Sequence, residues 1–162
     1  MRLDRAGIFK AKPTAWGVQK SEGSQSVAIA IDFTILAQLE GYEWADWSGY
    51  EEHTITGYFW VIKKDGSINS TTVTSICESL YWNCSLESIA NDPVPDMVVQ
   101  ITVKEETYNG QTRLKVGWLN PGDYSPKAAY APVEEVKELQ TRFGSLLRAA
   151  GGSSVPKTKA PF

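Results

Sequence analysis

Regular alternation of large apolar side chains with smaller or polar ones, from Val27 to Ile35 within residues 26–39, constrains the fold more than any other feature of this sequence. Every second position in the segment is apolar: Val27, Ile29, Ile31, Phe33 and Ile35. Because successive side chains of a β-strand point to opposite faces, the pattern predicts a strand with one face in the core. Residues 8–20 are predicted as an equally long strand, and the turn-forming residues 21–24 join the two.

A third strand is predicted over residues 53–63, after an acidic and aromatic loop over residues 40–52. Its apolar face carries Ile55, Gly57, Phe59 and Val61. Its opposite face carries Thr56, Tyr58, Trp60 and Ile62. Asp65-Gly66 ends this strand, and the polar residues 69–71 are good N-caps for a helix over about residues 71–81.

Asn109-Gly110 predicts the tip of a β-hairpin, because both central residues of a type I′ turn need positive φ. The strand before the turn alternates from Val99 onward, and the strand after it ends at about residues 120–122. In this last strand we expect one face to lie in the core, with Leu114, Val116 and Trp118.

Three strands, one helix and a two-strand hairpin follow the order of an OB-fold, which binds oligonucleotides or oligosaccharides. We therefore predict a mainly β fold, a five-stranded antiparallel OB-fold barrel over residues 1–124 with a helix between strands 3 and 4. Residues 125–150 are predicted as a linker and an amphipathic helix near 132–150, with Pro132 at its first position. The apolar stripe of this helix is Val133, Val136, Leu139, Phe143, Leu146 and Leu147. Residues 151–162 are predicted as a flexible basic tail.

The sequence lacks the run of roughly 18 apolar residues that a membrane-spanning helix requires, and its first residues lack the apolar stretch of a signal peptide. We therefore expect a cytoplasmic protein without membrane contact. Cys77 and Cys84 would lie about 10 Å apart on one continuous helix, which is beyond disulfide reach. We expect both thiols to be reduced and unlinked.

The residue types present give little support for catalysis or metal binding. His53 is the single histidine, and we expect it to be a solvated residue at the start of a strand. No Cys/His cluster has zinc spacing, and no glycine-rich phosphate loop is present in the sequence. We therefore expect no enzymatic activity and no cofactor.

The net charge of −3 argues against a uniformly basic nucleic-acid binder, but the charges are segregated along the chain. No Lys or Arg occurs over residues 21–62, where acidic residues gather between positions 40 and 52. After Leu139 the charged residues are all basic: Arg142, Arg148, Lys157 and Lys159.

Aromatic and basic residues interleave on the polar faces of the predicted strands. Binding a single strand without sequence choice requires π-surfaces for the bases and cations for the phosphates. The candidate nucleic-acid-binding residues are Tyr58, Trp60, Lys104, Arg113, Lys115, Trp16, Lys10 and Lys12. By strict alternation, the first strand places Lys10, Lys12, Thr14 and Trp16 on one face. The competing interpretation is structural, because Trp and Tyr also favour strands and could cap the core beneath the terminal helix.

Residues 56–121 contain several motifs that occur together in one group of proteins. They are Thr56-Gly57-Tyr58-Phe59, the helical segment to Trp82, residues 106–116 with the order Glu-Thr-Tyr-Asn-Gly-Gln-Thr-Arg-Leu-Lys-Val, and Trp118-Leu119-Asn120-Pro121. This segment resembles a family of small, mostly uncharacterised phage proteins, regarded as OB-fold single-stranded DNA-binding proteins of replication or recombination modules. The resemblance implies that Arg113 and Lys115 contact the DNA backbone, and that the protein works in the host cytoplasm.

The last residues, Ala160-Pro161-Phe162, are similar to the Pro-Phe ending of bacterial single-strand binders, whose acidic tails recruit partner proteins. Here Lys157 and Lys159 replace the acids, and a basic tail adds non-specific phosphate affinity. Recruitment of replication or recombination proteins through Pro161-Phe162 and added phosphate affinity are both left open.

We expect a protein that binds single-stranded DNA, with RNA as the other possible nucleic acid, largely without sequence preference. The C-terminal helix offers a route to oligomers. Two alternatives stay open. One is a protein-interaction OB domain in a phage assembly, which the acidic loop favours. The other is an oligosaccharide-binding module, because a row of Tyr and Trp also suits sugar rings.

Overall fold

The computed structural model describes residues 1–124 and 132–151. The chain divides into two units, Met1–Tyr124 and Ser125–Phe162. The predicted linker at residues 125–131 and the tail at residues 152–162, with Pro161-Phe162, lie outside the described residues.

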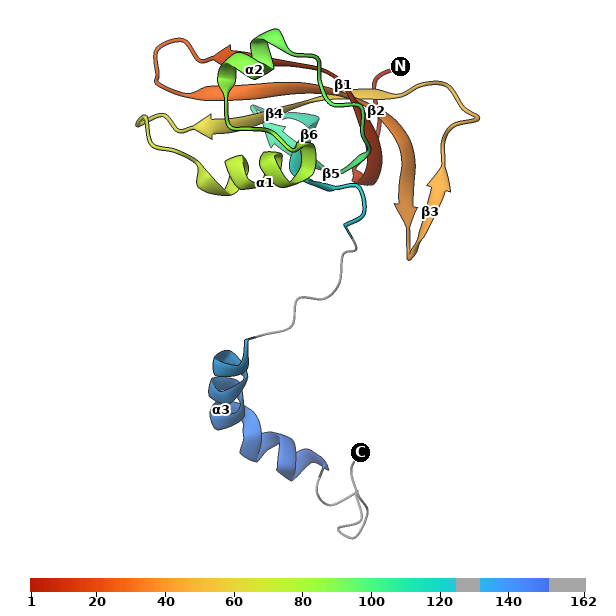
Figure 1. The fold of residues 1–162 in the computed structure, drawn as a ribbon. Coiled ribbons are helices and arrows are strands. Elements are labelled where there is room, and N and C mark those ends of the chain that lie inside the picture. The colour runs from red at the N-terminus through yellow and green to blue at the C-terminus, as the bar shows by residue number, and fades with distance from the viewer. Residues whose placement is uncertain (125–131, 152–162) are drawn as a thin grey trace. The chain divides into compact units, whose positions relative to one another are not determined.

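The first unit is built on one antiparallel sheet of six strands (Figure 1). The strands are β1 (Gly7–Lys20), β2 (Val27–Glu40), β3 (Glu43–Asp46), β4 (Thr54–Ile62), β5 (Val99–Tyr108) and β6 (Gln111–Pro121). They hydrogen-bond in the order β3-β2-β1-β5-β6, and β4 also pairs with β2. The prediction of a mainly β, antiparallel fold is confirmed.

The predicted five-stranded barrel is not confirmed, because the sheet has a sixth strand and is open. The additional strand, β3, lies in the segment predicted as a loop, where Gly41 has a φ of 65° and allows the chain to reverse after β2. Within residues 1–124, no hydrogen-bonded pairing joins β4 to β6. The two strands still approach through their side chains, since a Cβ added at Gly57 would lie 3.1 Å from the Cβ of Val116.

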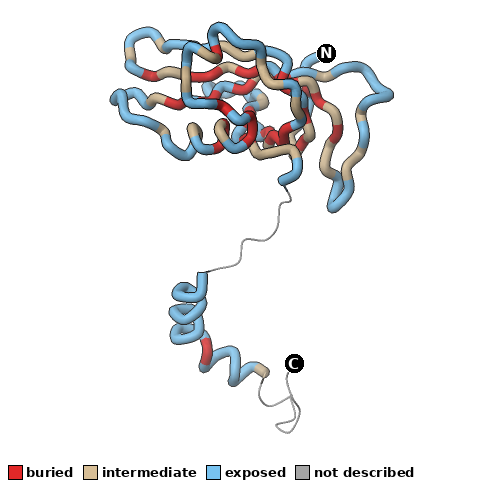
Figure 2. Tube along the Cα trace, viewed as in Figure 1, coloured by how far each residue is buried: buried red, intermediate tan, exposed pale blue. Residues whose placement is uncertain are grey.

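The core lies along the inward faces of the strands, where buried and exposed positions alternate (Figure 2). Its fully buried side chains include Phe9, Ile29, Ile31, Phe33, Ile76, Leu80, Ile101 and Leu119. The predicted core face of β2 is confirmed, and so is that of β4, on which Ile55, Phe59 and Val61 are buried.

Two helices connect β4 to β5, where a single helix was predicted. The predicted one is α1 (Ser70–Leu80), which contacts β4 and β6. The second, α2 (Leu86–Asn91), contacts β1 and begins at Ser85, whose hydroxyl accepts a hydrogen bond from the amide of Ser88 at 3.3 Å. With six residues, of which only Ile89 is buried, α2 is too short to leave a periodic pattern in the sequence.

The predicted hairpin is confirmed. Asn109 and Gly110 have φ values of 51° and 76° and connect β5 to β6. Both central residues of the turn therefore use positive φ, as a type I′ turn requires.

A β-bulge in β1 turns Trp16 toward the core. The register between β1 and β2 shifts between Pro13 and Ala15, so Trp16 pairs with the buried Ile31 and packs against the core cluster. An inserted residue exchanges the two faces of a strand beyond it. The prediction that Trp16 shares a face with Lys12 is therefore wrong.

A second bulge, in β6, has the opposite effect on Trp118. Val103 pairs with Val116 and Thr102 pairs with Trp118, which leaves Gly117 without a partner in β5. Val116 therefore faces the core, whereas Trp118 is 39% exposed. The prediction that Trp118 belongs to the core is wrong.

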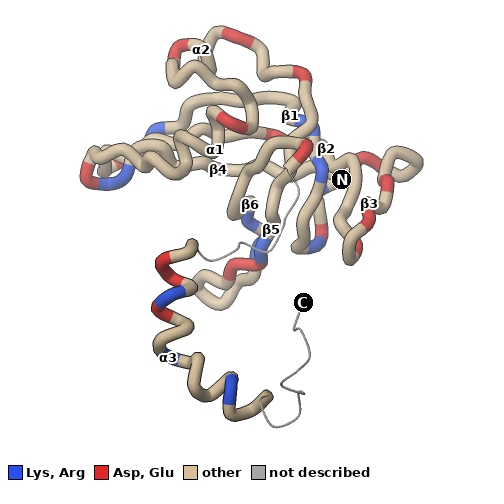
Figure 3. The backbone as a smooth tube through the Cα atoms, turned by 60° about the horizontal axis from the view of Figure 1, so that its bottom comes forward, with Lys and Arg blue, Asp and Glu red and all other residues tan. Residues whose placement is uncertain are grey.

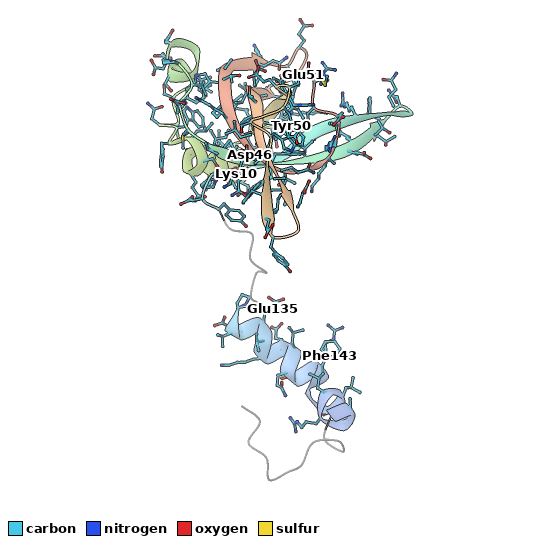
Figure 4. The ribbon with its side chains drawn as sticks, turned by 90° about the vertical axis from the view of Figure 1, so that its right-hand side faces the viewer. Lys10, Asp46, Tyr50, Glu51, Glu135 and Phe143 are labelled. Carbon is cyan, nitrogen blue, oxygen red and sulfur yellow. The ribbon has the colours of Figure 1, made fainter. Side chains whose placement is uncertain are left out.

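The second unit holds α3 (Val133–Gly151), which confirms the predicted C-terminal helix. Pro132 precedes the helix, and its carbonyl oxygen accepts a hydrogen bond from the amide of Val136 at 2.9 Å. All six side chains of the predicted apolar stripe are exposed. In Figure 4, Glu135 stands near the start of α3 and Phe143 farther along it. No helix in the described parts of the chain is long and apolar enough to cross a membrane.

Candidate functional site

Tyr58 and Trp60 stand side by side on the outward face of β4. The alternation that buries Phe59 and Val61 places these two rings outside, where they are 49% and 40% exposed. The predicted orientation of both side chains is therefore confirmed. An exposed aromatic pair two residues apart offers two ring faces along one strand.

Small residues occupy the positions beside these rings on the neighbouring strand. Ala30 of β2 pairs with Tyr58, and Ala28 pairs with Trp60. Beyond Ala30 in the same row lies Gly17 of β1. Ala30 and Gly17 are partly exposed and project little above the backbone, so the sheet beside Tyr58 presents a low surface, whereas Ala28 is fully buried.

The rings form one wall of a hollow between β4 and β6, here called the β4–β6 groove, with a volume of about 260 Å³. Its lining on β4 consists of Thr56, Tyr58 and Trp60. Its lining on β5 and β6 consists of Glu106, Arg113, Leu114, Lys115 and Val116. The structure thus brings four of the predicted binding residues, two aromatic and two basic, into one hollow.

Two cations and one carboxylate set the charge of the β4–β6 groove. The Arg113 Nε lies 3.4 Å from one oxygen of Glu106, and the Lys115 Nζ lies 3.8 Å from the other. Lys104 pairs with Lys115 across the hairpin, so it adds a third cation to the same face. Figure 3 shows the Lys and Arg positions of β5 and β6 close to acidic ones. The groove is therefore basic by one or two charges, and its carboxylate competes for the same cations.

The remaining predicted residues lie outside the groove. The Lys12 Nζ forms an ion pair with Asp96 at 2.7 Å. The Lys10 Nζ lies 4.7 Å from the centre of the Trp44 ring, in a cation–π contact. The indole nitrogen of Trp16 donates a hydrogen bond to the carbonyl oxygen of Asp92 at 2.9 Å, which ties β1 to the end of α2.

Trp118, which was not among the predicted binding residues, lines a separate hollow of about 300 Å³ between α1 and β6. The lining also includes four hydroxyl residues of α1, Ser70, Thr71, Thr74 and Ser75, and the carboxylate of Glu78. The ring nitrogen of Trp118 donates a hydrogen bond to the side-chain oxygen of Asn120 at 3.0 Å. Ser70, which lines this hollow, follows Asn69, whose side-chain amide donates a hydrogen bond to the backbone carbonyl of Trp60 at 3.0 Å. Only the register shift at Gly117 exposes Trp118, and the sequence alternation does not show it.

The predicted acidic loop is anchored by an aromatic cluster around Trp47. The ring of Trp47 packs edge-on against Phe9 at 5.7 Å and against His53 at 5.1 Å between ring centres. His53 is therefore partly buried, contrary to the prediction of a solvated residue, and its Nδ1 lies 2.7 Å from the carbonyl oxygen of Glu51. Figure 4 shows Asp46, Tyr50 and Glu51 around this loop.

The described residues contain no cluster of side chains that could bind a metal ion. Across residues 1–124 and 132–151, no group of three or more His, Cys, Asp or Glu side chains is placed to hold a metal ion. The chain matches no protein-family model and no curated protein.

Proposed function

We propose that the first unit binds single-stranded DNA at the β4–β6 groove, largely without sequence preference. The observation that carries the proposal is the exposed pair Tyr58 and Trp60 in one hollow with Arg113 and Lys115. Flat rings beside cations are the combination that single strands need, because bases stack on the rings and phosphates pair with the cations.

We also propose that the sheet is a variant of the OB-fold. The pairings β1–β2, β2–β4, β1–β5 and β5–β6, with α1 between β4 and β5, agree with a five-stranded, partly open Greek-key barrel to which β3 is added. In that fold the second and third barrel strands form the usual binding face for oligonucleotides. In this chain they correspond to β2 and β4, on which Ala30 is partly exposed and Tyr58 and Trp60 are exposed.

The groove favours stacking over phosphate attraction as the main source of affinity. Stacking on an aromatic side chain contributes about 1–3 kcal/mol per base. The ion pairs of Glu106 are exposed, and such pairs contribute only about 0–1 kcal/mol, so a phosphate can displace the carboxylate from Arg113 and Lys115.

A fluorescence titration tests the proposal. Poly-dT should quench tryptophan emission, and Trp60→Ala should weaken binding by about 1–3 kcal/mol while leaving the circular dichroism spectrum unchanged. Tyr42→Ala is the control, because Tyr42 is a fully exposed aromatic residue in the β2–β3 turn, outside the groove. Equal affinity for duplex DNA, or equal loss in both variants, would refute the groove as the site. Poly-U in the same titration measures the preference for DNA over RNA.

The proposed cellular role, in a phage-type replication or recombination system, rests on the sequence resemblance of residues 56–121. Displacement of poly-dT by a carbohydrate would instead favour the oligosaccharide-binding alternative.

Association with a second copy through α3 is a second candidate function. The observation that favours it is the row of exposed apolar residues on α3. Its first half carries Glu134, Glu135 and Glu138 against one cation, Lys137, and its second half carries Arg142 and Arg148. Two such helices placed antiparallel would match acidic halves with basic halves. Sedimentation at increasing protein concentration tests it, and Leu146→Asp should leave a monomer if the idea is right.

A further inference from the structure

The two cysteines, seven residues apart along the chain, lie in contact. Cys77 is in α1 and Cys84 follows it, yet their Sγ atoms are 3.1 Å apart. Both are free thiols. The separation of about 10 Å, expected for one continuous helix, is wrong because Cys84 lies beyond the end of α1. The helix ends at Leu80, and Tyr81 and Cys84 both adopt positive φ, 53° and 65°, so the chain folds back on the helix.

Hydrogen bonds hold this reversal in place. Trp82 is buried, and its indole nitrogen donates to the carbonyl oxygen of Ser85 at 2.9 Å. The side-chain oxygen of Asn83 accepts from the Ser85 amide and from the Ser88 hydroxyl, each at 3.0 Å. The two thiols are therefore held together before any reaction, and a bond between them needs an approach of only about 1 Å.

The two thiols differ in accessibility. Cys84 is exposed, whereas Cys77 is partly buried and packs against the core. Burial, together with the hydrogen bond and charge of Cys84, raises the pKa of Cys77 to about 11, so Cys77 keeps its proton at neutral pH. An oxidant in solution therefore reaches Cys84 first, with Cys77 behind it as the resolving thiol.

We propose that Cys77 and Cys84 form a redox-active dithiol that peroxides convert into an intramolecular disulfide and that small dithiols reduce again. The thiolate of Cys84 attacks one oxygen of hydrogen peroxide, and the S–O bond of a sulfenic acid forms as the O–O bond breaks. The hydroxide that leaves takes up the proton lost by the Cys84 thiol and becomes the first water molecule. The sulfur of Cys77 then attacks the sulfur of Cys84. The S–S bond forms as the S–O bond breaks, and the leaving hydroxide takes the proton of Cys77 as the second water molecule. Two thiols are oxidised by two electrons, and one peroxide is reduced.

The disulfide would join α1 to the segment that enters α2. The end of α2 receives the hydrogen bond from Trp16, so oxidation would tighten the connection between both helices and β1. Neither cysteine lines the β4–β6 groove, which includes Trp60, or the hollow that includes Trp118. The proposed thiol chemistry is therefore independent of the proposed nucleic-acid binding.

The test treats the full chain with one equivalent of hydrogen peroxide and follows it by thiol counting and intact-mass spectrometry. We expect both thiols to disappear together, with the loss of two hydrogen masses from a monomer, and dithiothreitol to restore them. Cys77→Ser should accumulate a Cys84 sulfenic acid that dimedone traps, and Cys84→Ser should react much more slowly. Circular dichroism checks that both variants fold.

Several outcomes would overturn the proposal. They are oxidation of wild type that stops at sulfinic acid, disulfides that form only between chains, or dimedone trapping at Cys77 in preference to Cys84. Because wild type is measured without substitution, the result does not depend on whether either variant folds.

Discussion

Replacing Gly57 by Ala tests the close approach of β4 to β6, on which the β4–β6 groove depends. An added Cβ would lie 2.9 and 3.1 Å from atoms of the Phe59 ring and 3.1 Å from the Cβ of Val116. The ring can turn, but the Val116 Cβ is fixed to the backbone of β6. Overpacking of this kind costs about 1–3 kcal/mol, and the lower entropy of the unfolded Ala chain returns about 0.4–1 kcal/mol. We expect a net loss of about 0–2.6 kcal/mol relative to wild type, and of about 1–3 kcal/mol relative to a Gly→Ala change that meets no neighbour.

The assay is urea unfolding followed by tryptophan fluorescence and circular dichroism, with the midpoint compared at equal slope. Gly17→Ala is the matched control, because Gly17 lies in β1 and a Cβ there would meet nothing within 4 Å. The control should be stabilised by about 0.4–1 kcal/mol. If Gly57→Ala proves as stable as Gly17→Ala, the two strands do not approach as described, and the groove between them is not formed.

Three further predictions concern the groove, its neighbouring hollow and the loop after β4. Glu106→Gln should raise affinity for poly-dT about threefold at low salt, since a unit charge about 6 Å from a phosphate in water is worth about 0.7 kcal/mol; unchanged affinity would place the phosphates elsewhere. Trp118→Ala should weaken binding of oligonucleotides long enough to pass Trp60 by about 1–3 kcal/mol and leave shorter ones unaffected, which a length series measures. Hydrogen bonds from the hydroxyl and amide of Ser67 hold the pKa of Asp65 below its ordinary 3.8. The ionised Asp65 therefore stabilises the folded protein above pH 3.8, and this contribution is lost as the pH falls through the folded-state pKa. Asp65→Ala should therefore destabilise the protein more at about pH 7 than at about pH 2, measured by urea unfolding.

The elements that could be predicted from the sequence are those whose pattern depends on residues close together in the chain. The alternation of β2, the two faces of β4, the turn at Asn109-Gly110 and the helix α3 are all present in the structure. Each depends on near neighbours in the chain, because strand alternation and turn conformation are decided within a few residues.

The orientations of Trp16 and Trp118 could not be predicted in the same way. Each follows a bulge, and a bulge is defined by two residues opposing one on the partner strand. Alternation read along one strand carries no information about its partner, so every position beyond the bulge is assigned to the wrong face. The candidate Trp16 therefore packs against the core, and Trp118, which was assigned to the core, is exposed at the surface.

The prediction that Cys77 and Cys84 lie far from each other failed for a related reason. The predicted distance assumed a continuous helix, but the helix ends at Leu80 and the chain reverses through two residues with positive φ, neither of them glycine. Tyr81 and Cys84 give no sequence signal for that conformation, because residues with side chains rarely adopt it.

The salt dependence of binding separates the proposed groove from a generally basic surface. Among the residues that the structure describes, Arg113 and Lys115 line the groove and Lys104 pairs with Lys115 beside it. Each phosphate contact on a single strand contributes about −0.7 to the slope of log affinity against log salt. Three contacts predict a slope of about −2, so a fourfold rise in salt should weaken binding about twentyfold. Arg113→Ala should make the salt slope shallower by about 0.7. Trp60→Ala should lower the affinity but leave the salt slope unchanged. A slope of about −4 or steeper in the wild type would mean that cations outside the groove supply most of the contacts, and the assignment of the site to β4 and β6 would fail.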